Sequence, residues 1–366
     1  MLIPAIPLGN VFEISTHYLY LGLTLFVFFA AHFIKHDGKK KIPFLLLFLL
    51  WFFAVTRDWV GRDYEAYYEI FRTATWGGYS QAYTSIEPGF YYLNAFLNSI
   101  CPYEYFGFMF FHFAILFLTY RCITYFGPNI SFPYALLAYM AAWYFLSFSL
   151  LRICIAASII SYSIHFLLEK MYKKFFLLIL LTFCIHMSSI VMIIPGVAYI
   201  LYQKRPLMVF IGFGLILVII NSSVGNLLNQ YMSIERYQGY LKMEEGTGIG
   251  FNLFFTYLPF IYWLWIGKKY VPMQLWELSL VFTLFAFIIQ FSGYRITVMG
   301  RMQAYAIVPF LIYLPSLIAY LRRYAPKRKY ISNSIAIFIY LMIKYYFFLP
   351  QLYWSDDIMP YKSLIF

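Results

Sequence analysis

Apolar residues along the chain fall into long runs separated by short polar breaks. A membrane-spanning helix needs about 20 consecutive, predominantly apolar residues, and runs of this kind recur along the whole chain. The pattern predicts an all-α polytopic membrane protein with about 12 transmembrane helices, forming a single membrane-embedded domain over residues 1–366. The candidate spans are 17–34, 42–56, 103–120, 131–150, 153–169, 175–187, 188–202, 207–222, 251–266, 275–292, 303–321 and 331–349.

Two longer polar segments, about 57–102 and 223–250, are predicted to be loops on the outer side of the membrane. The first contains an apolar part, Gly89–Ile100, but at about 1.5 Å per residue a helix there reaches only about 18 Å. We therefore expect an amphipathic helix that lies at the outer interface without crossing. Pro88 favours an extended backbone at Glu87 and a fixed start for this helix.

The basic residues give the orientation, because Lys and Arg are enriched in cytoplasmic loops. Placing the basic breaks inside puts both termini outside. The cytoplasmic loops then hold 17 Lys and Arg against 3 acidic residues, and the outer side holds 10 against 12. The acidic residues agree with this orientation although they do not define it. The basic breaks contain Lys35, Lys39–Lys41, Arg121, Lys170, Lys173, Lys174, Lys204, Arg205, Lys268, Lys269, Arg322, Arg323 and Lys327–Lys329.

Composition narrows the possible functions. Hydrophobic residues make up 63% of the chain and charged residues 11%, against roughly 25% charged in soluble proteins. This excludes a sizeable soluble catalytic domain, a secreted disulfide scaffold and a nucleic-acid binder. The four cysteines lack CxxC spacing, and nucleotide-binding glycine motifs are absent. The first apolar run has no basic segment before it, so we expect a retained span rather than a cleaved signal peptide.

The first outer segment begins with an unusual polar grouping. Arg57, Asp63, Tyr64 and Tyr67 fall within twelve positions that hold two Arg and two Asp. One interpretation is an anchor at the lipid headgroups. The other is a phosphate and sugar site, because guanidinium groups bind phosphate bidentately and carboxylates accept hydrogen bonds from sugar hydroxyls.

Arginines at the predicted outer ends of spans are the sharper signal. Arg152 is flanked by apolar residues and has no acid within a helical turn. At a span centre it would cost about 2.5–3.5 kcal/mol, so we expect it to face a polar cavity, with snorkelling to the interface as the alternative. Arg295 and Arg301 flank a short outer turn before Tyr305. The pattern favours an anion site that faces outward.

Two further groups are weaker candidates. His186 lies between the short spans 175–187 and 188–202, where we expect the outer tip of a helical hairpin, and it is either a base or a packing residue. Arg236 and Tyr237 lie in the second outer loop and form either a substrate contact or a surface ion pair.

These residues in this order resemble the EpsG-like branch of the Wzy-type polysaccharide polymerases, and the resemblance runs over most of the chain. One departure is Arg62, which stands where the family usually has Thr in Gly-Thr-Asp-Tyr. The matching pieces are Arg57 to Tyr67, Glu-Pro-Gly-Phe (Glu87 to Phe90), Leu-Arg-x3-Ala (Leu151 to Ala156), the hairpin Lys173 to Ser188, the loop Arg236 to Tyr240, Arg-x3-Tyr (Arg301 to Tyr305) and Pro360-Tyr361.

The resemblance implies a fold like that of C-type membrane glycosyltransferases in the bacterial inner (cytoplasmic) membrane, with a cavity that faces the periplasm. It implies transfer of a growing undecaprenyl-pyrophosphate-linked glycan onto a new lipid-linked repeat unit, without a nucleotide sugar, metal or other cofactor. The partners would be these lipid-linked oligosaccharides, the bilayer and a chain-length regulator, with no nucleic acid.

Such a reaction needs two kinds of group. Cations must stabilise the departing pyrophosphate, and we expect Arg152, Arg295, Arg301 and Arg57 there. A base must accept a proton from the attacking hydroxyl. Asp63 or Glu87 is the first choice for this base and His186 the second. We expect Tyr64, Tyr67, Arg236, Tyr237 and Tyr305 to contact sugars.

Two other functions remain open from the sequence. A flippase for lipid-linked oligosaccharides would have titratable residues deep in both halves of the membrane, yet the inner half here has almost none. An O-antigen ligase would share the outer arginines but typically has one large outer loop, whereas two longer outer loops are predicted here.

Overall fold

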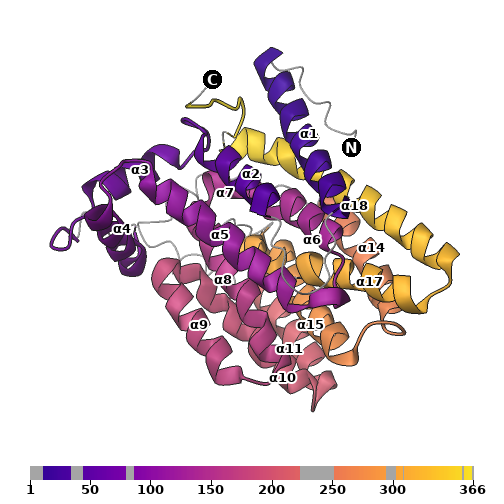
Figure 1. The fold of residues 1–366 in the computed structure, drawn as a ribbon. Coiled ribbons are helices and arrows are strands. Elements are labelled where there is room, and N and C mark those ends of the chain that lie inside the picture. Colours follow the sequence, from indigo (N-terminus) through magenta and orange to yellow (C-terminus); the bar gives the residue numbers. More distant parts are fainter. Residues whose placement is uncertain are drawn as a thin grey trace.

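The chain is almost entirely helical wherever the computed structural model describes it (Figure 1). Four helices are long and apolar enough to cross a membrane by length and composition, and shorter apolar helices accompany them. This is the architecture of an all-α membrane protein, as predicted. The described residues are 11–33, 44–79, 86–222, 251–293, 302–307, 309–356 and 358–364.

Helical segments occupy all twelve predicted spans. Several are shorter than a bilayer crossing needs, so the number of crossings stays a prediction. The segments are α1 (Val11–Phe33), α2 (Phe44–Val55), α5 (Phe106–Tyr125), α6 (Phe132–Tyr139) with η3 (Met140–Tyr144) and α7 (Leu146–Ser149), α8 (Leu151–Leu168), α9 (Tyr172–Ile185), η4 (Met187–Met192) with α10 (Ile193–Tyr202), α11 (Pro206–Asn221), α14 (Phe251–Gly267), α15 (Met273–Gly293), η6 (Met302–Ile307) with η7 (Pro309–Tyr313) and α17 (Leu314–Tyr324), and α18 (Lys327–Asp356).

Two interruptions in these segments determine where polar side chains emerge. Leu150 has non-helical backbone angles, φ −94° and ψ 59°, so α8 starts directly after it and Arg152 lies in the first turn. His186 is extended, with φ −151° and ψ 109°, and separates α9 from η4. Both breaks fall where the sequence predicts outer ends of spans. Broken helices are tolerated at membrane depth when protein surrounds them.

Two short helices, α3 (Tyr64–Thr73) and α4 (Pro88–Ile100), form the left edge of the view in Figure 1. They pack on each other, and α4 also packs on α5 and α9. Glu87 is extended, with φ −67° and ψ 137°, and Pro88 opens α4. The predicted start of this loop helix is therefore confirmed.

Only part of the apolar face of α4 is covered by protein. Phe90 and Leu97 are buried, whereas Phe96 and Ile100 are 46% and 59% exposed. Their exposure agrees with the predicted location of α4 at the membrane interface.

The C-terminal tail lies against the ends of α1 and α2. The backbone N–H of Asp58 donates to the carbonyl of Lys362 at 2.9 Å. The ring of Tyr361 stacks on Phe53, with centroids 4.5 Å apart, and its backbone N–H donates to Thr16 at 2.9 Å. These contacts join the first part of α1, the end of α2 with the residues after it, and the C-terminal tail. All three are predicted to be on the outer side.

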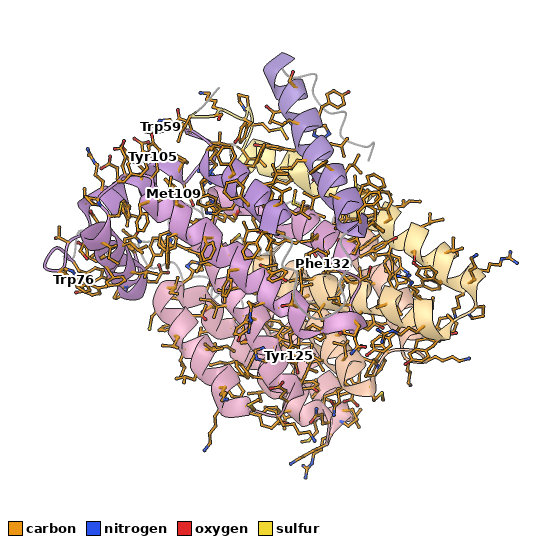
Figure 2. All side chains as sticks on the ribbon, viewed as in Figure 1. Trp59, Trp76, Tyr105, Met109, Tyr125 and Phe132 are labelled. Carbon is orange, nitrogen blue, oxygen red and sulfur yellow. The ribbon has the colours of Figure 1, made fainter. Side chains whose placement is uncertain are left out.

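A second set of contacts joins segments that are predicted to be on the inner side. Nη1 of Arg323, at the end of α17, donates to Oδ1 of Asn129 at 2.8 Å. Asn129 ends η2 (Gly127–Asn129), which follows α5. In Figure 2, Tyr105 lies at one end of α5 and Tyr125 at the other. The contacts thus group the helix ends as the predicted topology expects, and which end is outside stays a prediction.

Candidate active site

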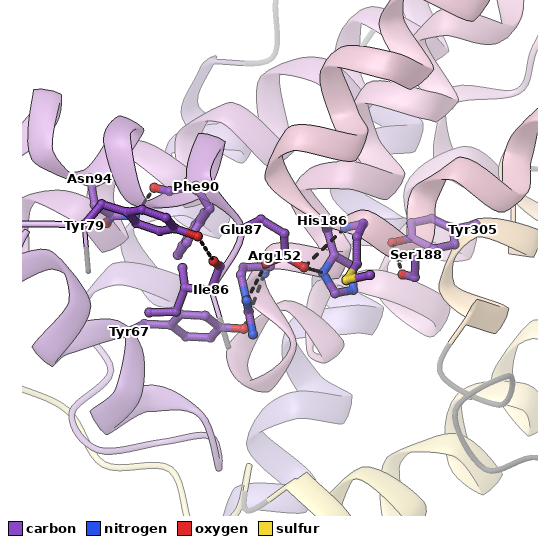
Figure 3. Close-up of polar contacts among 11 residues, drawn as sticks. Tyr67, Tyr79, Ile86, Glu87, Phe90, Asn94, Arg152, His186, Ser188 and Tyr305 are labelled. Atoms are coloured by element: carbon purple, nitrogen blue, oxygen red, sulfur yellow. Dashed lines mark hydrogen bonds and ion pairs between the residues drawn. The ribbon is translucent and has the colours of Figure 1, made fainter. Parts of the chain in front are cut away.

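Glu87 is the centre of a polar cluster that joins three parts of the chain (Figure 3). Its side chain is only 5% exposed. Oε2 accepts a hydrogen bond from Nη1 of Arg152 at 2.6 Å. Oε1 accepts from the backbone N–H of Met187 at 3.2 Å and lies 3.1 Å from Nδ1 of His186. Glu87, Arg152 and His186 are called the Glu87 cluster below.

Local backbone structure places Glu87 at the start of α4. Because Pro88 disfavours a helical conformation in the preceding residue, the helix begins after Glu87 rather than before it. A carboxylate at a helix N-terminus is stabilised by the helix dipole. The same extended residue directs the side chain toward α8 and the break before η4, where its partners lie.

Arg152 reaches Glu87 from the first turn of α8. Its guanidinium lies 5.8 Å from the centre of the Phe90 ring and 6.0 Å from that of Tyr67. Cation–π contacts of this kind stabilise a partly desolvated guanidinium. The side chain is 21% exposed, so the group is held by protein and still reaches the surface. Glu87 is the ion-pair partner of Arg152.

His186 presents its two ring nitrogens differently. Nδ1 faces Glu87, and a carboxylate in that position favours the tautomer with the proton on Nδ1. Nε2 has no hydrogen-bond partner within the described ranges, and the side chain is 16% exposed. In the neutral tautomer, Nε2 is therefore the hydrogen-bond acceptor of the ring.

The charge state of Glu87 follows from opposing effects. Burial alone would raise its pKa, but the hydrogen bond with His186 and the positive charge of Arg152 outweigh burial and lower the pKa to about 2. Glu87 is thus ionised at neutral pH and binds a proton weakly. An anion of this kind can orient an imidazole and balance a guanidinium, but it is a poor proton acceptor.

Close packing between α4 and α9 holds the cluster together. A Cβ atom built on Gly89 would lie 2.5 Å from the carbonyl oxygen of Cys184, which real side chains do not tolerate. Gly89 is two residues after Glu87, and Cys184 is two residues before His186. The glycine therefore lets the two helices approach closely enough for Glu87 to reach His186.

A second polar contact, between Ser188 and Tyr305, lies next to His186. Oγ of Ser188 and the hydroxyl of Tyr305 are 2.9 Å apart, and Tyr305 is fully buried in η6. η6 packs on α8, η4 and α15. In Figure 3, this pair lies next to His186 on the side away from Tyr67.

The residues predicted from the first outer segment occupy different positions. Tyr67 lies within the site, where its hydroxyl accepts a 3.5 Å hydrogen bond from the backbone N–H of Arg152. Asp63 precedes α3, and its carboxylate interacts electrostatically with both Arg152 and Tyr67. Tyr64 instead packs away in the core, stacked on Phe108 with centroids 4.6 Å apart.

Arg57 is buried and makes hydrogen bonds and ring contacts with several protein groups. It is 1% exposed, and Nη1 contacts the carbonyl of Ala54 at 2.5 Å and Nε2 of His112 at 2.6 Å. Its other contacts include the carbonyl of Phe148 at 3.5 Å and the ring of that residue. Burial lowers the pKa of Arg57 to about 10, so it keeps its charge at neutral pH. The geometry indicates that Arg57 fixes the loop before α3 against the segment before α8.

Several predicted residues lie outside the described parts of the chain: Arg236, Tyr237, Arg295 and Arg301. Among the described residues, no group of three or more His, Cys, Asp or Glu side chains could hold a metal ion.

Two contributions to the site were not predicted from the sequence, the ring of Phe90 and the backbone N–H of Met187. The Glu-Pro-Gly-Phe run contains the signal for Phe90, since the residue three positions after Glu87 shares its helix end.

Together the helices and the Glu87 cluster define an all-α membrane protein with a partly buried Glu–Arg–His site at the ends of broken helices. The EpsG family model matches residues 40–363 of the chain. The chain belongs to the EpsG family, whose members are Wzy-like polysaccharide polymerases. This confirms the resemblance found in the sequence. No curated protein and no solved structure matches the chain.

Proposed function

We propose that this protein is a glycosyltransferase that polymerises lipid-linked repeat units. The donor is a growing glycan on undecaprenyl pyrophosphate, and the acceptor is the non-reducing sugar of a new lipid-linked repeat unit. The acceptor oxygen attacks the anomeric carbon from the face opposite the pyrophosphate. The bond between that carbon and the pyrophosphate oxygen breaks, its electron pair leaves with the pyrophosphate, and the anomeric configuration inverts.

His186 is the proposed proton acceptor in this reaction. Nε2 takes the proton of the attacking hydroxyl while Nδ1 donates to Glu87, which orients the ring and stabilises the imidazolium that forms. This reverses the order of preference from the sequence, where Glu87 came first. The low pKa of Glu87 and its burial support an orienting role. Asp63 is the remaining carboxylate candidate for the base.

Arg152 is the proposed cation for the departing pyrophosphate. A guanidinium has five N–H donors, and one of those on Nη1 donates to Glu87. A charged donor held in place before the reaction stabilises developing negative charge without reorganising. Arg295 and Arg301 are expected to contribute further positive charge beside it.

Two aromatic residues lie on opposite sides of the Glu87 cluster in Figure 3, Tyr67 and Tyr305. Tyr67 is proposed to contact a sugar at the site, whereas Tyr305, which is fully buried, is proposed to act on the sugar through Ser188, the partner of its hydroxyl. Arg236 and Tyr237 are expected to add contacts from the second outer loop. Arg57 and Tyr64 are proposed to position the first loop rather than touch substrate.

The proposed location is the bacterial inner membrane with the site facing the periplasm. Lipid-linked repeat units would reach it from within the bilayer, and a chain-length regulator is the expected protein partner. No nucleotide sugar, metal or other cofactor enters the proposed reaction.

The observation that carries this proposal is the joint position of Arg152 and His186 on one carboxylate. The two residues are far apart in sequence, yet Glu87 contacts both within 3.1 Å. A glycosyl transfer from a pyrophosphate needs both of their chemistries at one place: a cation for the leaving group and a base for the nucleophile.

Gel analysis of surface glycan tests the function. A strain that carries His186→Asn in place of the wild-type chain should display single repeat units on its lipid anchor or core, without a ladder. The control His32→Asn changes an exposed histidine near the end of α1 and should leave the ladder intact. Loss of all surface repeats would indicate a ligase or flippase instead, and an unchanged ladder would remove His186 from the site.

A further inference from the structure

Lys344 is a lysine within the apolar helix α18, away from the Glu87 cluster. Its ammonium donates to Oγ1 of Thr256 on α14 at 2.5 Å. It also lies 5.8 Å from the centre of the Phe310 ring. Phe310 belongs to η7 and is itself buried. The lysine therefore points into the helix bundle rather than along the surface.

The charge of Lys344 has no counterion in the described parts of the chain. The ion pairs there involve other residues, and the contacts of Lys344 are those with Thr256 and Phe310. An ammonium has three N–H donors, and a single hydroxyl accepts from one of them. Ionisable residues within membrane helices are rare, usually paired and usually part of a binding site. Among the described residues, an anion is the partner that this lysine lacks.

Lys344 and Arg152 lie at matching heights in their helices. Lys344 is 17 residues beyond Lys327, where α18 begins at its predicted inner end. Arg152 is 17 residues before Glu169, the C-cap at the predicted inner end of α8. At about 1.5 Å per residue, each side chain is about 25 Å along its helix from that end. In the predicted orientation, both cations therefore belong to the outer half of their helices.

The two cations are on different sides of the segment formed by η6 and η7. Tyr305 of η6 contacts Ser188 beside the Glu87 cluster, whereas Phe310, five residues later, contacts Lys344. Figure 1 shows α4 and α9 on the left of the molecule and α14 and α18 on the right. This segment therefore lies between the two cationic positions.

We propose that Lys344, with the hydroxyl of Thr256, forms a second binding site for the pyrophosphate of a prenyl lipid. The inference rests on the proposed function, because a polymerase of lipid-linked units holds two such lipids at once. The pyrophosphate at Arg152 departs during the reaction, while the one at Lys344 stays attached to its glycan. Lys344 is thus a binding residue for the acceptor lipid and takes no part in proton transfer.

Binding stoichiometry tests this proposal. The purified full-length protein in phosphatidylcholine nanodiscs is titrated with geranylgeranyl pyrophosphate, and the bound equivalents are counted. We expect two equivalents for the wild type, one for Lys344→Met and two for Lys344→Arg, which keeps the charge. The control Lys204→Met removes an exposed lysine at the predicted inner side and should retain two.

Three results would overturn the second site: one equivalent for the wild type, two for Lys344→Met, or two for the wild type in phosphatidylcholine but one in nanodiscs with phosphatidylglycerol. The last would identify Lys344 as a contact for ordinary anionic lipid. If Lys344→Met does not fold, Thr256→Val should also bind one equivalent, and two would overturn the proposal. The stoichiometry is independent of catalysis, so a wild type that binds two equivalents without polymerising would contradict only the proposed function.

Discussion

Replacing Glu87 by Gln removes the charge of the site's central carboxylate while keeping its size. The pKa of Glu87 is about 2, against an ordinary 4.5. At about 1.4 kcal/mol for each pKa unit, the ionised carboxylate contributes about 3 kcal/mol to folding at neutral pH. Removing one partner of a buried ion pair typically costs about 3–5 kcal/mol, which agrees with this magnitude.

The contribution of Glu87 to stability depends on pH in a definite direction. The pKa is lower in the folded than in the unfolded protein, so the stabilisation is fully present above pH 4.5 and is lost as the pH falls toward 2. With an unfolding entropy of about 2.1 cal/mol/K per residue over 366 residues, about 3 kcal/mol corresponds to a change in Tm of about 4 °C.

Thermal unfolding of the purified protein in detergent measures this effect. We expect Glu87→Gln to lower Tm by about 4 °C at pH 7 and by clearly less at pH 3. The matched control is Glu69→Gln. It breaks an exposed ion pair in which Oε2 of Glu69 lies 3.0 Å from Nη2 of Arg72. Exposed pairs contribute about 0–1 kcal/mol, so Tm should barely change. Equal effects of the two substitutions, or a Glu87→Gln effect that is the same at both pH values, would refute the reasoning.

Three further predictions concern the cation, the orientation and the packing of the site. Arg152→Lys should abolish polymerisation without loss of membrane insertion, because lysine keeps the charge but lacks the bidentate guanidinium; chain lengths on gels measure this. Alkaline phosphatase fused after Ser99 should be active, and fused after Asn129 inactive. Gly89→Ala should lower Tm by a few degrees, since overpacking costs about 1–3 kcal/mol. Gly77→Ala should leave Tm unchanged, because a Cβ atom on Gly77 would meet no atom within 4 Å.

Each of these predictions has a result that contradicts it. Wild-type chain lengths in Arg152→Lys at equal protein level would remove that residue from the pyrophosphate site. Active phosphatase after Asn129 together with inactive enzyme after Ser99 would reverse the orientation. Equal Tm values for Gly89→Ala and Gly77→Ala would show that the close approach of α4 to α9 is not maintained in the membrane.

The sequence predicts the helices of this protein well because membrane helices have a direct signature in apolar runs. The same signature locates the start of α4, since the effect of Pro88 on Glu87 is local. The predicted hairpin tip at His186 is the extended break before η4. Each of these features depends on residues within one or two helical turns.

The pairing within the site could not be predicted in the same way. Glu87 meets Arg152 across 65 positions and His186 across 99, and nothing local to Glu87 indicates either contact. The low pKa of Glu87 follows from that pairing alone, and so does the orienting role proposed for it. Arg57 shows the converse, because its sequence neighbours favour a substrate site whereas its contact with His112, 55 positions away, supports the positioning role proposed for it.

The most direct test of the account is polymerisation by the purified protein. Proteoliposomes that contain the protein and lipid-linked repeat units, with a metal chelator and without nucleotide sugars, should produce a ladder of lipid-linked glycans. His186→Asn should lower the rate by about 10²–10⁴, as removal of a general base does. A wild type that forms no ladder under these conditions, or a His186→Asn variant that forms it at the wild-type rate, would contradict the account.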